Sequence, residues 1–326
     1  MLVEKKYESK SPSTSATPHA ALKNSWLKDD ATVKRSHDRC QQTIGAPVEV
    51  RGIGYLTGRQ VRLRFRPAPA STGVVFVRTD LGAEACIPAR VEFVTGTTRR
   101  TTLGQSPVQV GLVEHVLAAL SGLRIDNCFV ELDAPEPPGL DGSAQSFVKA
   151  LLRAGTVTQS ERRAVWTVDQ PMTLAAKDAT IALHPVEKAE LRVSYLLDYG
   201  LKSPIPWQIC TQTITPGSFA TQVAPCRTFV TEEEAIMLRK QGLGRRTTVN
   251  DLLVYGCQGP INNKVRFGNE PARHKILDIL GDLSLIGCDL LGHVVAYRTG
   301  HPHNIQLVQL LSLQMHRVLR RQRCAA

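Results

Sequence analysis

Two histidines and an aspartate, spread over two distant stretches of the chain, could together hold a metal ion. His274 and Asp278 are four residues apart, so on a helix both side chains point to the same side. His115 is the third candidate ligand, because it lies in a segment of helical apolar spacing and follows Glu114, a carboxylate that could move protons. Two imidazoles and one carboxylate, with the fourth coordination position left open, are typical of a catalytic rather than a structural zinc ion.

The same residues also permit an ordinary structural interpretation. A histidine and an aspartate at this spacing often occur by chance, and a histidine on an apolar face is usually a hydrogen-bonded core residue. Spacing alone leaves both interpretations open. The eight cysteines include no CxxC pair, which argues against a disulfide framework and against a thiolate zinc site. Any metal should therefore be held by histidine and carboxylate.

Amphipathic segments should position these candidates. Apolar periodicity predicts one helix over 110–120, which carries Glu114 and His115, and another over 270–286, which carries the HxxxD pair. Further helices are expected after Ser143 and over 232–241. Alternating patterns predict strands over 48–54, 60–65, 73–77, 85–88, 127–132, 164–168, 179–184, 190–197 and 291–298.

The order of these elements is similar in the two halves of the chain. We predict an α+β fold of two similar β-α-α-β sandwich domains, each a sheet with two helices, with the active site at their interface. The expected parts are a disordered N-terminal extension (1–44), a first domain (45–160), a second domain (161–312) and a basic C-terminal tail (313–326). Such an element order is also common in α+β proteins, so unlike strand orders in the two halves would exclude a duplication.

Composition limits the class of protein. The chain has 326 residues, 42% of them hydrophobic and 21% charged, which suits a globular protein of two domains. No stretch approaches the ~20 apolar residues of a membrane-spanning helix, and the N-terminus has no apolar core of the signal-peptide type. We therefore expect a cytoplasmic protein.

A net charge of +11 can mark a partner that carries phosphate, whether nucleic acid, anionic lipid or a phosphorylated small molecule, and the charge alone does not choose among them. Much of the excess lies near the C-terminus, where no aromatic residues are interleaved to stack on bases. A solvated basic tail is the favoured interpretation, and no nucleic-acid partner is expected.

Six stretches of the chain resemble one enzyme family. The chain is similar to the UDP-3-O-acyl-N-acetylglucosamine deacetylases, zinc hydrolases of lipid A biosynthesis. The similar stretches follow one another in family order from about residue 45 to residue 312, and they read RPAPASTGVVFVRTDL (66–81), VEHVLAALSGLRIDNCFVEL (113–132), LDGSAQSF (140–147), CRTF (226–229), NEPARHKILDILGDLSLIG (269–287) and TGHPHNIQL (299–307).

The resemblance implies the same metal ligands that the spacing suggests, His115, His274 and Asp278. It implies that Glu114 is the general base for the hydrolytic water and that protonated His301 stabilises charge and assists the leaving amine. Asp282 is implied to orient His301, which agrees with its position one helical turn after Asp278. The remaining implied residues are Thr228, as a donor to the oxyanion, and Lys275 and Phe229, as substrate-binding residues.

The implied reaction is removal of the N-acetyl group of UDP-3-O-(3-hydroxyacyl)-N-acetylglucosamine, with release of acetate. The implied cofactor is Zn2+, with Fe2+ as the alternative in the cell. A monomer is expected, with the UDP-linked acylated amino sugar as substrate and transient contact with the anionic inner membrane.

Two of the departures from the family pattern bear on the identity of the substrate. Leu56, within Gly52–Gly58, stands where the family usually has a histidine, and an acidic run over 232–234 replaces the usual apolar residues. These departures leave open a second hypothesis, a homologous zinc amidase that acts on a different N-acyl amino sugar.

Overall fold

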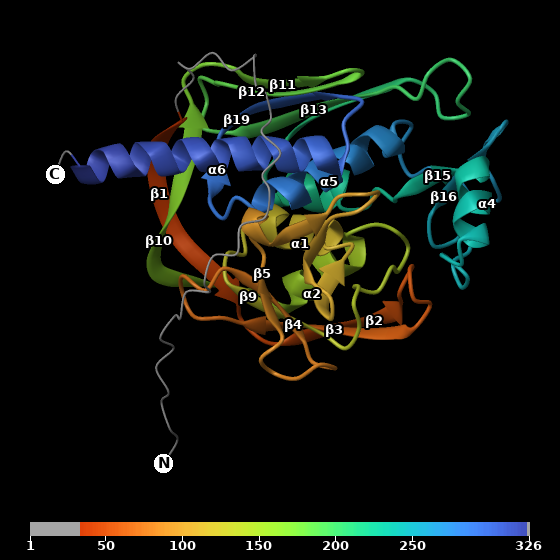
Figure 1. Cartoon of the computed structure of the whole chain (residues 1–326), viewed down its shortest axis with the longest axis horizontal. Helices are drawn as coiled ribbons and strands as arrows, with labels where there is room; N and C mark the ends of the chain where they lie inside the picture. The colour runs from red at the N-terminus through yellow and green to blue at the C-terminus, as the bar shows by residue number, and fades with distance from the viewer. Residues whose placement is uncertain (1–32, 325–326) are drawn as a thin grey trace.

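The computed structural model describes residues 33–324, which form four layers in the order sheet, helices, helices, sheet (Figure 1). The first sheet has the strand order β2-β3-β9-β4-β5 and the second β11-β12-β19-β13-β14. Their bounds are β2 Val48–Ile53, β3 Gln60–Pro67, β4 Val74–Arg78, β5 Cys86–Pro88, β9 Cys128–Leu132, β11 Met172–Ala176, β12 Ala179–His184, β13 Leu191–Leu197, β14 Gln208–Thr213 and β19 Gly292–Tyr297.

The two sheets have the same topology. In each sheet the late strand, β9 or β19, is inserted between two earlier strands, antiparallel to one (β3 or β12) and parallel to the other (β4 or β13). The outer pairs are antiparallel in both sheets. Identical strand order and direction confirm the predicted duplication and the α+β class.

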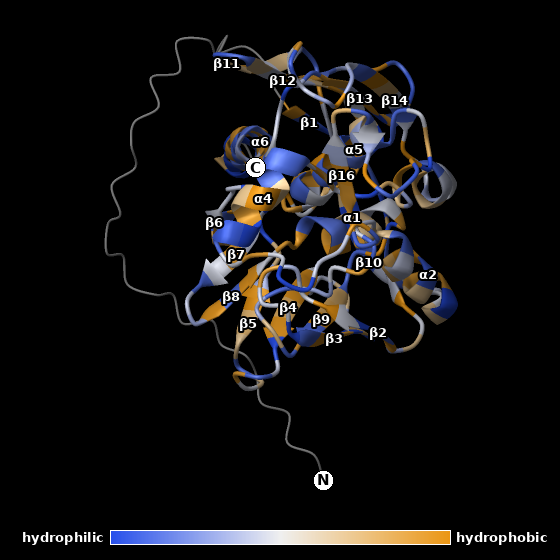
Figure 2. Ribbon diagram, turned by 90° about the vertical axis from the view of Figure 1, so that its right-hand side faces the viewer, coloured by the Kyte–Doolittle hydropathy of each residue, from blue (hydrophilic) through white to orange (hydrophobic). Residues whose placement is uncertain are grey.

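Alternation explains the strands of the first sheet. In β3, Val61, Leu63 and Phe65 are buried, while the arginines between them face outward and pair with Glu49 and Glu131. Figure 2 shows hydrophobic residues along β4 and β5 of the same sheet. The buried face packs against the helices.

Each repeat supplies two helices to the central layers. They are α1 (Glu114–Gly122) and α2 (Gln145–Ala154) in the first repeat, and α5 (Glu270–Ser284) and α6 (His301–Cys324) in the second. Helix α5 is buried on nearly all sides because it packs against both α1 and the second sheet. A Cβ atom at Gly281 of α5 would lie 2.2 Å from the carbonyl oxygen of Glu114. A glycine is therefore required where α1 and α5 cross.

Each repeat also carries an insertion before its first helix. The first insertion is a small sheet of β6 (Val94–Gly96), β7 (Thr102–Gln105) and β8 (Val108–Gly111), preceded by the 3-10 turn Val91–Phe93. The second contains the short helical segments Pro216–Ser218 and Phe219–Val223, followed by β15 (Phe229–Thr231), α4 (Glu232–Lys240), β16 (Leu253–Gly256) and β17 (Gly259–Pro260). The predicted helix over 110–120 was placed too early, because residues up to Gly111 belong to β8.

A long two-stranded ribbon joins the repeats. Strand β1 (Val33–Ile44) pairs with β10 (Thr156–Val168), which also pairs with β18 (Asp289–Leu290). The disordered extension predicted over 1–44 is wrong for residues 33–44; residues 1–32 lie outside the described part. Apolar periodicity is weak in β1 because most of its side chains are at least partly exposed, and the strand is held by pairing with β10. The predicted domain boundary at residue 160 falls within β10.

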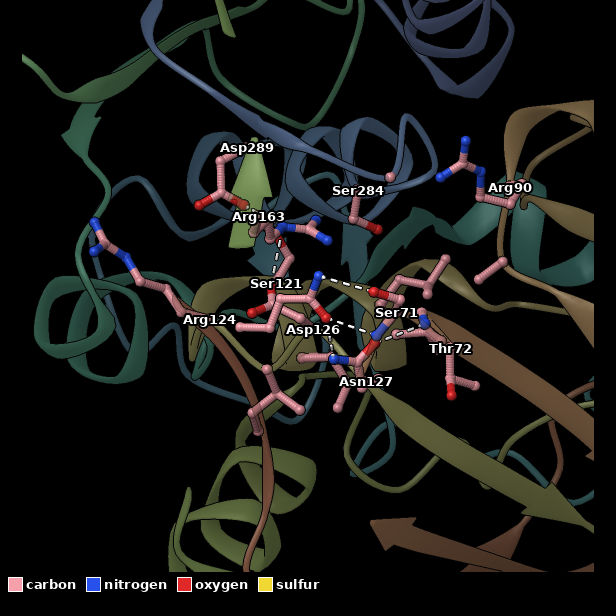
Figure 3. A pocket seen from close by; sticks show the side chains of 18 of the residues that line it. Ser71, Thr72, Arg90, Ser121, Arg124, Asp126, Asn127, Arg163, Ser284 and Asp289 are labelled. Atoms are coloured by element: carbon pink, nitrogen blue, oxygen red, sulfur yellow. Dashed lines mark hydrogen bonds and ion pairs between the residues drawn. The ribbon is translucent and has the colours of Figure 1, made fainter. Parts of the chain in front are cut away.

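Charged side chains fasten this ribbon to both repeats. Arg39 of β1 and Arg163 of β10 are paired in register, and each contacts the carboxylates of both Asp126 and Asp289 at 2.6–2.9 Å. Asp126 follows α1 and Asp289 follows α5, at equivalent positions of the repeats. These residues line a pocket at the C-terminal ends of α1 and α5 (Figure 3).

The C-terminal residues continue a helix rather than forming a separate tail. Helix α6 extends to Cys324, and its arginines at 317, 320, 321 and 323 are exposed. The tail predicted over 313–326 is therefore helical as far as residue 324, because Leu310, Leu311 and Met315 bury one face of the same helix. Among residues 33–324, no helix combines the length and the apolar character needed to span a membrane.

Candidate metal centre

The structure brings His115, His274 and Asp278 together from the facing helices of the two repeats. One ligand atom of each lies within 4.8 Å of the others. Nε2 of His274 is 3.3 Å and Nε2 of His115 is 3.8 Å from Oδ1 of Asp278, and the two imidazole rings are nearly perpendicular. This is the one such group of possible ligands in the described part of the chain.

Hydrogen bonds and burial prepare these side chains to bind a cation. Nδ1 of His274 lies 3.0 Å from the carbonyl oxygen of Cys226, so an Nδ1–H donor leaves the Nε2 lone pair free to face the cluster. Burial, together with the neighbouring His274, lowers the pKa of His115 to about 3. Burial likewise lowers the pKa of His274. Both imidazoles are therefore neutral at pH 7, as metal ligands must be.

The third ligand is held ionised. Burial opposes the charge of Asp278, but Lys275, whose Nζ donates to Oδ2 at 2.7 Å, holds the pKa of Asp278 far below its usual value. Oδ1 remains directed at the two imidazoles. Two neutral imidazoles and one carboxylate oxygen that converge in this way fit a divalent cation such as Zn2+ or Fe2+.

Glu114 lies beside this cluster as the first residue of α1. Its carboxylate is buried, Oε2 accepts the backbone N–H of Thr101 at 3.1 Å, and Oε1 lies 3.8 Å from Nε2 of His301. Burial raises the pKa of Glu114 to about 7. Such a carboxyl group exchanges protons readily near neutral pH.

His301 and Asp282 form a buried pair on the other side of Glu114. Nδ1 of His301, at the start of α6, donates to Oδ2 of Asp282 at 2.8 Å. Burial opposes protonation, but the carboxylates of Asp282 and Glu114 raise the pKa of His301 to about 9. The imidazole is therefore a cation at neutral pH, with Nε2 directed towards Glu114.

The chain is similar to known proteins over most of its length. The family model for UDP-3-O-acyl N-acetylglycosamine deacetylases matches residues 41–312. The chain belongs to this family. A UDP-3-O-acyl-N-acetylglucosamine deacetylase of Trichormus variabilis is 40% identical over 275 residues, which make up 82% of this chain and 97% of that protein. A deacetylase of the same name from Chlamydia abortus is 38% identical over 271 residues, covering 83% of this chain and 96% of the relative.

Deacetylases of this family are metalloenzymes, and all the candidate residues of this chain lie within the matched segment. The structure places Phe229 next to the cluster, with its ring 6.1 Å from that of His274 and 5.9 Å from that of Tyr199. Lys275 is tied to Asp278, as described above. Thr228 lies two residues after Cys226, and its backbone bonds to Gly142 and Leu253 at the start of β15.

The segment that carries Cys226 and Thr228 is fixed to α5, the helix that carries His274 and Asp278, by a buried ion pair. Both the backbone N–H and Nε of Arg227 donate to Oε1 of Glu270, the first residue of α5, at 3.0 and 2.8 Å. Because Arg227 directly follows Cys226, this pair restrains the Cys226 carbonyl, which accepts a hydrogen bond from Nδ1 of His274. The motif stretch CRTF contains the arginine, but its partner was not identified from the sequence.

Two further polar residues of this deacetylase were missed by sequence reasoning. The hydroxyl of Thr101 donates to Oδ1 of Asp282 at 2.6 Å, and the amide of Asn304 donates to Oδ2 at 2.9 Å. Asn304 lies one helical turn after His301, a spacing that could have signalled it. Thr101 is one of several threonines in a polar stretch, and nothing in its immediate sequence distinguishes it.

Both departures from the family pattern have a structural setting. The backbone N–H of Leu56 donates to the buried carboxylate of Glu136 at 2.8 Å, within the turn that follows β2. The acidic run forms the first turn of α4, where negative charge favours a helix N-terminus. Within it, Glu234 completes a capping box with Thr231 and pairs with Arg99 at 3.0 Å.

Proposed function

We propose that this chain hydrolyses the N-acetyl group of UDP-3-O-(3-hydroxyacyl)-N-acetylglucosamine, which is the committed step of lipid A biosynthesis. The observation that carries the proposal is the arrangement around the His115–His274–Asp278 cluster, with a buried carboxylate on one side and a histidine–aspartate pair behind it. The names of the relatives supply the substrate class. The reaction is the hydrolysis of an amide bond.

The proposed cofactor is Zn2+ held by His115, His274 and Asp278, with Fe2+ as the alternative in the cell. The bound ion supplies a nucleophile at neutral pH and polarises the acetyl carbonyl. The donor set described above supports this assignment because neutral imidazole and carboxylate suit both metals.

Glu114 is the proposed general base. With a pKa near 7, its carboxylate accepts a proton from the attacking water and can give that proton up again in the same catalytic cycle. The water oxygen bonds to the acetyl carbon, and the bond from that carbon to the sugar nitrogen breaks. Acetate and the free amine are the products.

Protonated His301 is the proposed acid. Its Nε2–H stabilises developing negative charge and delivers a proton to the departing nitrogen, while Asp282 keeps the imidazole charged and oriented. The hydroxyl of Thr228 is the proposed hydrogen-bond donor to the developing oxyanion. Lys275 uses one of its three donors on Asp278 and keeps others for the sugar and phosphate oxygens of the substrate. Phe229 contributes an apolar wall beside the metal ligands.

The cellular setting is part of the proposal. We expect a cytoplasmic monomer that contacts the anionic inner membrane transiently and binds no nucleic acid. The exposed arginines at the end of α6 favour an anionic surface over a neutral one.

The deciding experiment is acetate release from the UDP-linked 3-O-acyl-N-acetylglucosamine, measured on chelator-treated protein before and after Zn2+ is restored. Activity that disappears and returns supports the proposal. A protein that binds zinc but releases no acetate would refute it.

A different N-acyl amino sugar is the second candidate substrate, motivated by Leu56 in place of the usual histidine. The acidic run gives this candidate little support, because Glu234 is engaged in capping and ion pairing. Equal turnover of the acylated and the non-acylated UDP sugar would favour it.

A further inference from the structure

We propose that Thr101 is a positioning residue that fixes the Glu114 carboxylate and the His301–Asp282 pair relative to each other. This inference rests on the proposed function, since it assigns Thr101 a role in the same reaction. Thr101 precedes β7 at the base of the first insertion, and it is completely buried.

All three polar groups of Thr101 are directed at the candidate site. Its backbone N–H donates to Oε2 of Glu114 at 3.1 Å, and its carbonyl accepts the N–H of Val113, the N-cap residue of α1, at 3.4 Å. Its hydroxyl donates to Oδ1 of Asp282 at 2.6 Å and lies 3.3 Å from Nδ1 of His301. One residue thus contacts the proposed base, the proposed acid and the carboxylate behind the acid.

The hydroxyl determines the orientation of Asp282. Oδ2 of Asp282 is shared by His301 and Asn304, whereas Oδ1 accepts the Thr101 hydroxyl. With both oxygens engaged, the plane of the carboxylate is fixed, and so is the imidazole that donates to it. Nε2 of His301 then lies 3.8 Å from Oε1 of Glu114, while the Thr101 N–H holds the other oxygen of that glutamate.

A threonine suits this position better than a serine or valine. Its branched side chain has few rotamers, so the hydroxyl is pre-oriented towards Asp282. Valine has the same shape without the donor. A fully buried carboxylate oxygen that loses its donor is no longer satisfied, which should allow Asp282 and His301 to reorient.

Activity measurements on three variants test the role of the hydroxyl. We expect Thr101→Val to lower kcat about 10- to 100-fold with KM changed less than about threefold, because small displacements of acid–base groups are costly. Thr101→Ser should recover activity to within about fivefold of the original chain, since it keeps the hydroxyl. The matched control is Thr43→Val, which removes another buried threonine hydroxyl, bonded to the Asn127 carbonyl and remote in sequence from the site.

A double-mutant cycle with Asp282→Asn separates positioning from general damage. If Thr101 acts through Asp282, Thr101→Val should have little further effect in the Asp282→Asn background. An equal loss of kcat in both backgrounds, or a Thr101→Val enzyme within twofold of the original chain, overturns the proposal. Thr101→Cys, which keeps a small side chain with only a weak donor, replaces the valine variant if that variant does not fold.

A spectroscopic measurement makes the test independent of the substrate. The Nδ1–H proton of His301 should give a low-field resonance in the original chain, assigned by its absence in His301→Asn. We expect this signal to disappear in Thr101→Val and to persist in Thr101→Ser and Thr43→Val. Persistence of the signal in Thr101→Val would refute the positioning role. If the signal is lost in Thr101→Val but the original chain releases no acetate, only the proposed function is refuted.

Discussion

Nε2 of His115 lies 3.8 Å from Oδ1 of Asp278, and the two residues occupy equivalent positions of the duplicated unit. His115 lies six residues before Ser121 of α1, and Asp278 lies six residues before Ser284 of α5; each of these serines follows a leucine. Asp126 and Asp289 follow the two serines at equal distances. The candidate metal site therefore brings together residues from equivalent positions of the two repeats. The ligands it uses there differ in kind.

Removal of the metal should abolish activity and lower the melting temperature together, because an ion bound only by the folded chain stabilises that state. His274→Ala should reproduce both effects and should not retain zinc by elemental analysis. The control is His316→Ala, an exposed histidine of α6, which should keep its zinc and its activity. A His274→Ala protein with a full complement of zinc would contradict the ligand assignment.

Glu114→Ala should keep the metal and lose most of its turnover. The carboxylate lies outside the ligand group, and loss of a general base typically costs 10²- to 10⁴-fold in rate. Zinc content and kcat measured on the same preparation check this expectation. A fully active Glu114→Ala enzyme would show that another group takes the proton.

His301 should set the alkaline limb of the pH–rate profile. Because its pKa is raised to about 9, the imidazolium is present below that pH, and turnover should fall as the pH rises through about 9. The charged groups around it are Asp282, Glu114 and Asp278. Asp282→Asn removes the carboxylate that raises the pKa of His301 most, so the alkaline limb should shift to lower pH. An unchanged limb would show that another group is titrating there.

The same shift makes a prediction for stability. The folded-state pKa of His301 exceeds its unfolded value of about 6.5, so its contribution to stability is complete below pH 6.5 and is lost as the pH rises through about 9. Urea unfolding at pH 6 and pH 9.5 should show a smaller pH dependence for His301→Asn than for the original chain. Equal dependence in both proteins would argue against the charged imidazole.

Gly281→Ala should destabilise the protein and impair catalysis together. The added methyl group would lie 2.2 Å from the Glu114 carbonyl oxygen, so α1 and α5 must separate, at a cost of about 1–3 kcal/mol. Gly268→Ala is the control, because a Cβ atom there meets nothing within 4 Å. Thermal unfolding and kcat should change for Gly281→Ala only.

Local spacing explains why two residues of the candidate metal cluster could be predicted from the sequence. His274 and Asp278 are placed on one side of a helix by a four-residue separation, and the α+β duplication followed from a repeated order of elements. His115 required the additional inference that a second helix faces the first. The resemblance to the family added His301 and Asp282, which lie on different helices, α6 and α5.

Thr101 could not be predicted in this way because it lies 181 residues from Asp282, and only the folding of the first insertion against α5 brings them together. The strand β1 was missed for a related reason. Most of its side chains are not buried, so its sequence lacks the alternation of a core strand, and its stability depends on β10 and on the ion pairs of Arg39. Interactions between distant segments leave no periodic pattern in either segment.

The equivalence of His115 and Asp278 has a consequence for the origin of the site. An assembly of two identical half-length chains would present the same residue twice across its symmetry axis, either two histidines or two aspartates. A mixed pair requires the halves to be encoded separately, so that each can diverge without changing the other. Covalent fusion of the repeats permits the first repeat to place the neutral His115 at the position where the second repeat places the negatively charged Asp278.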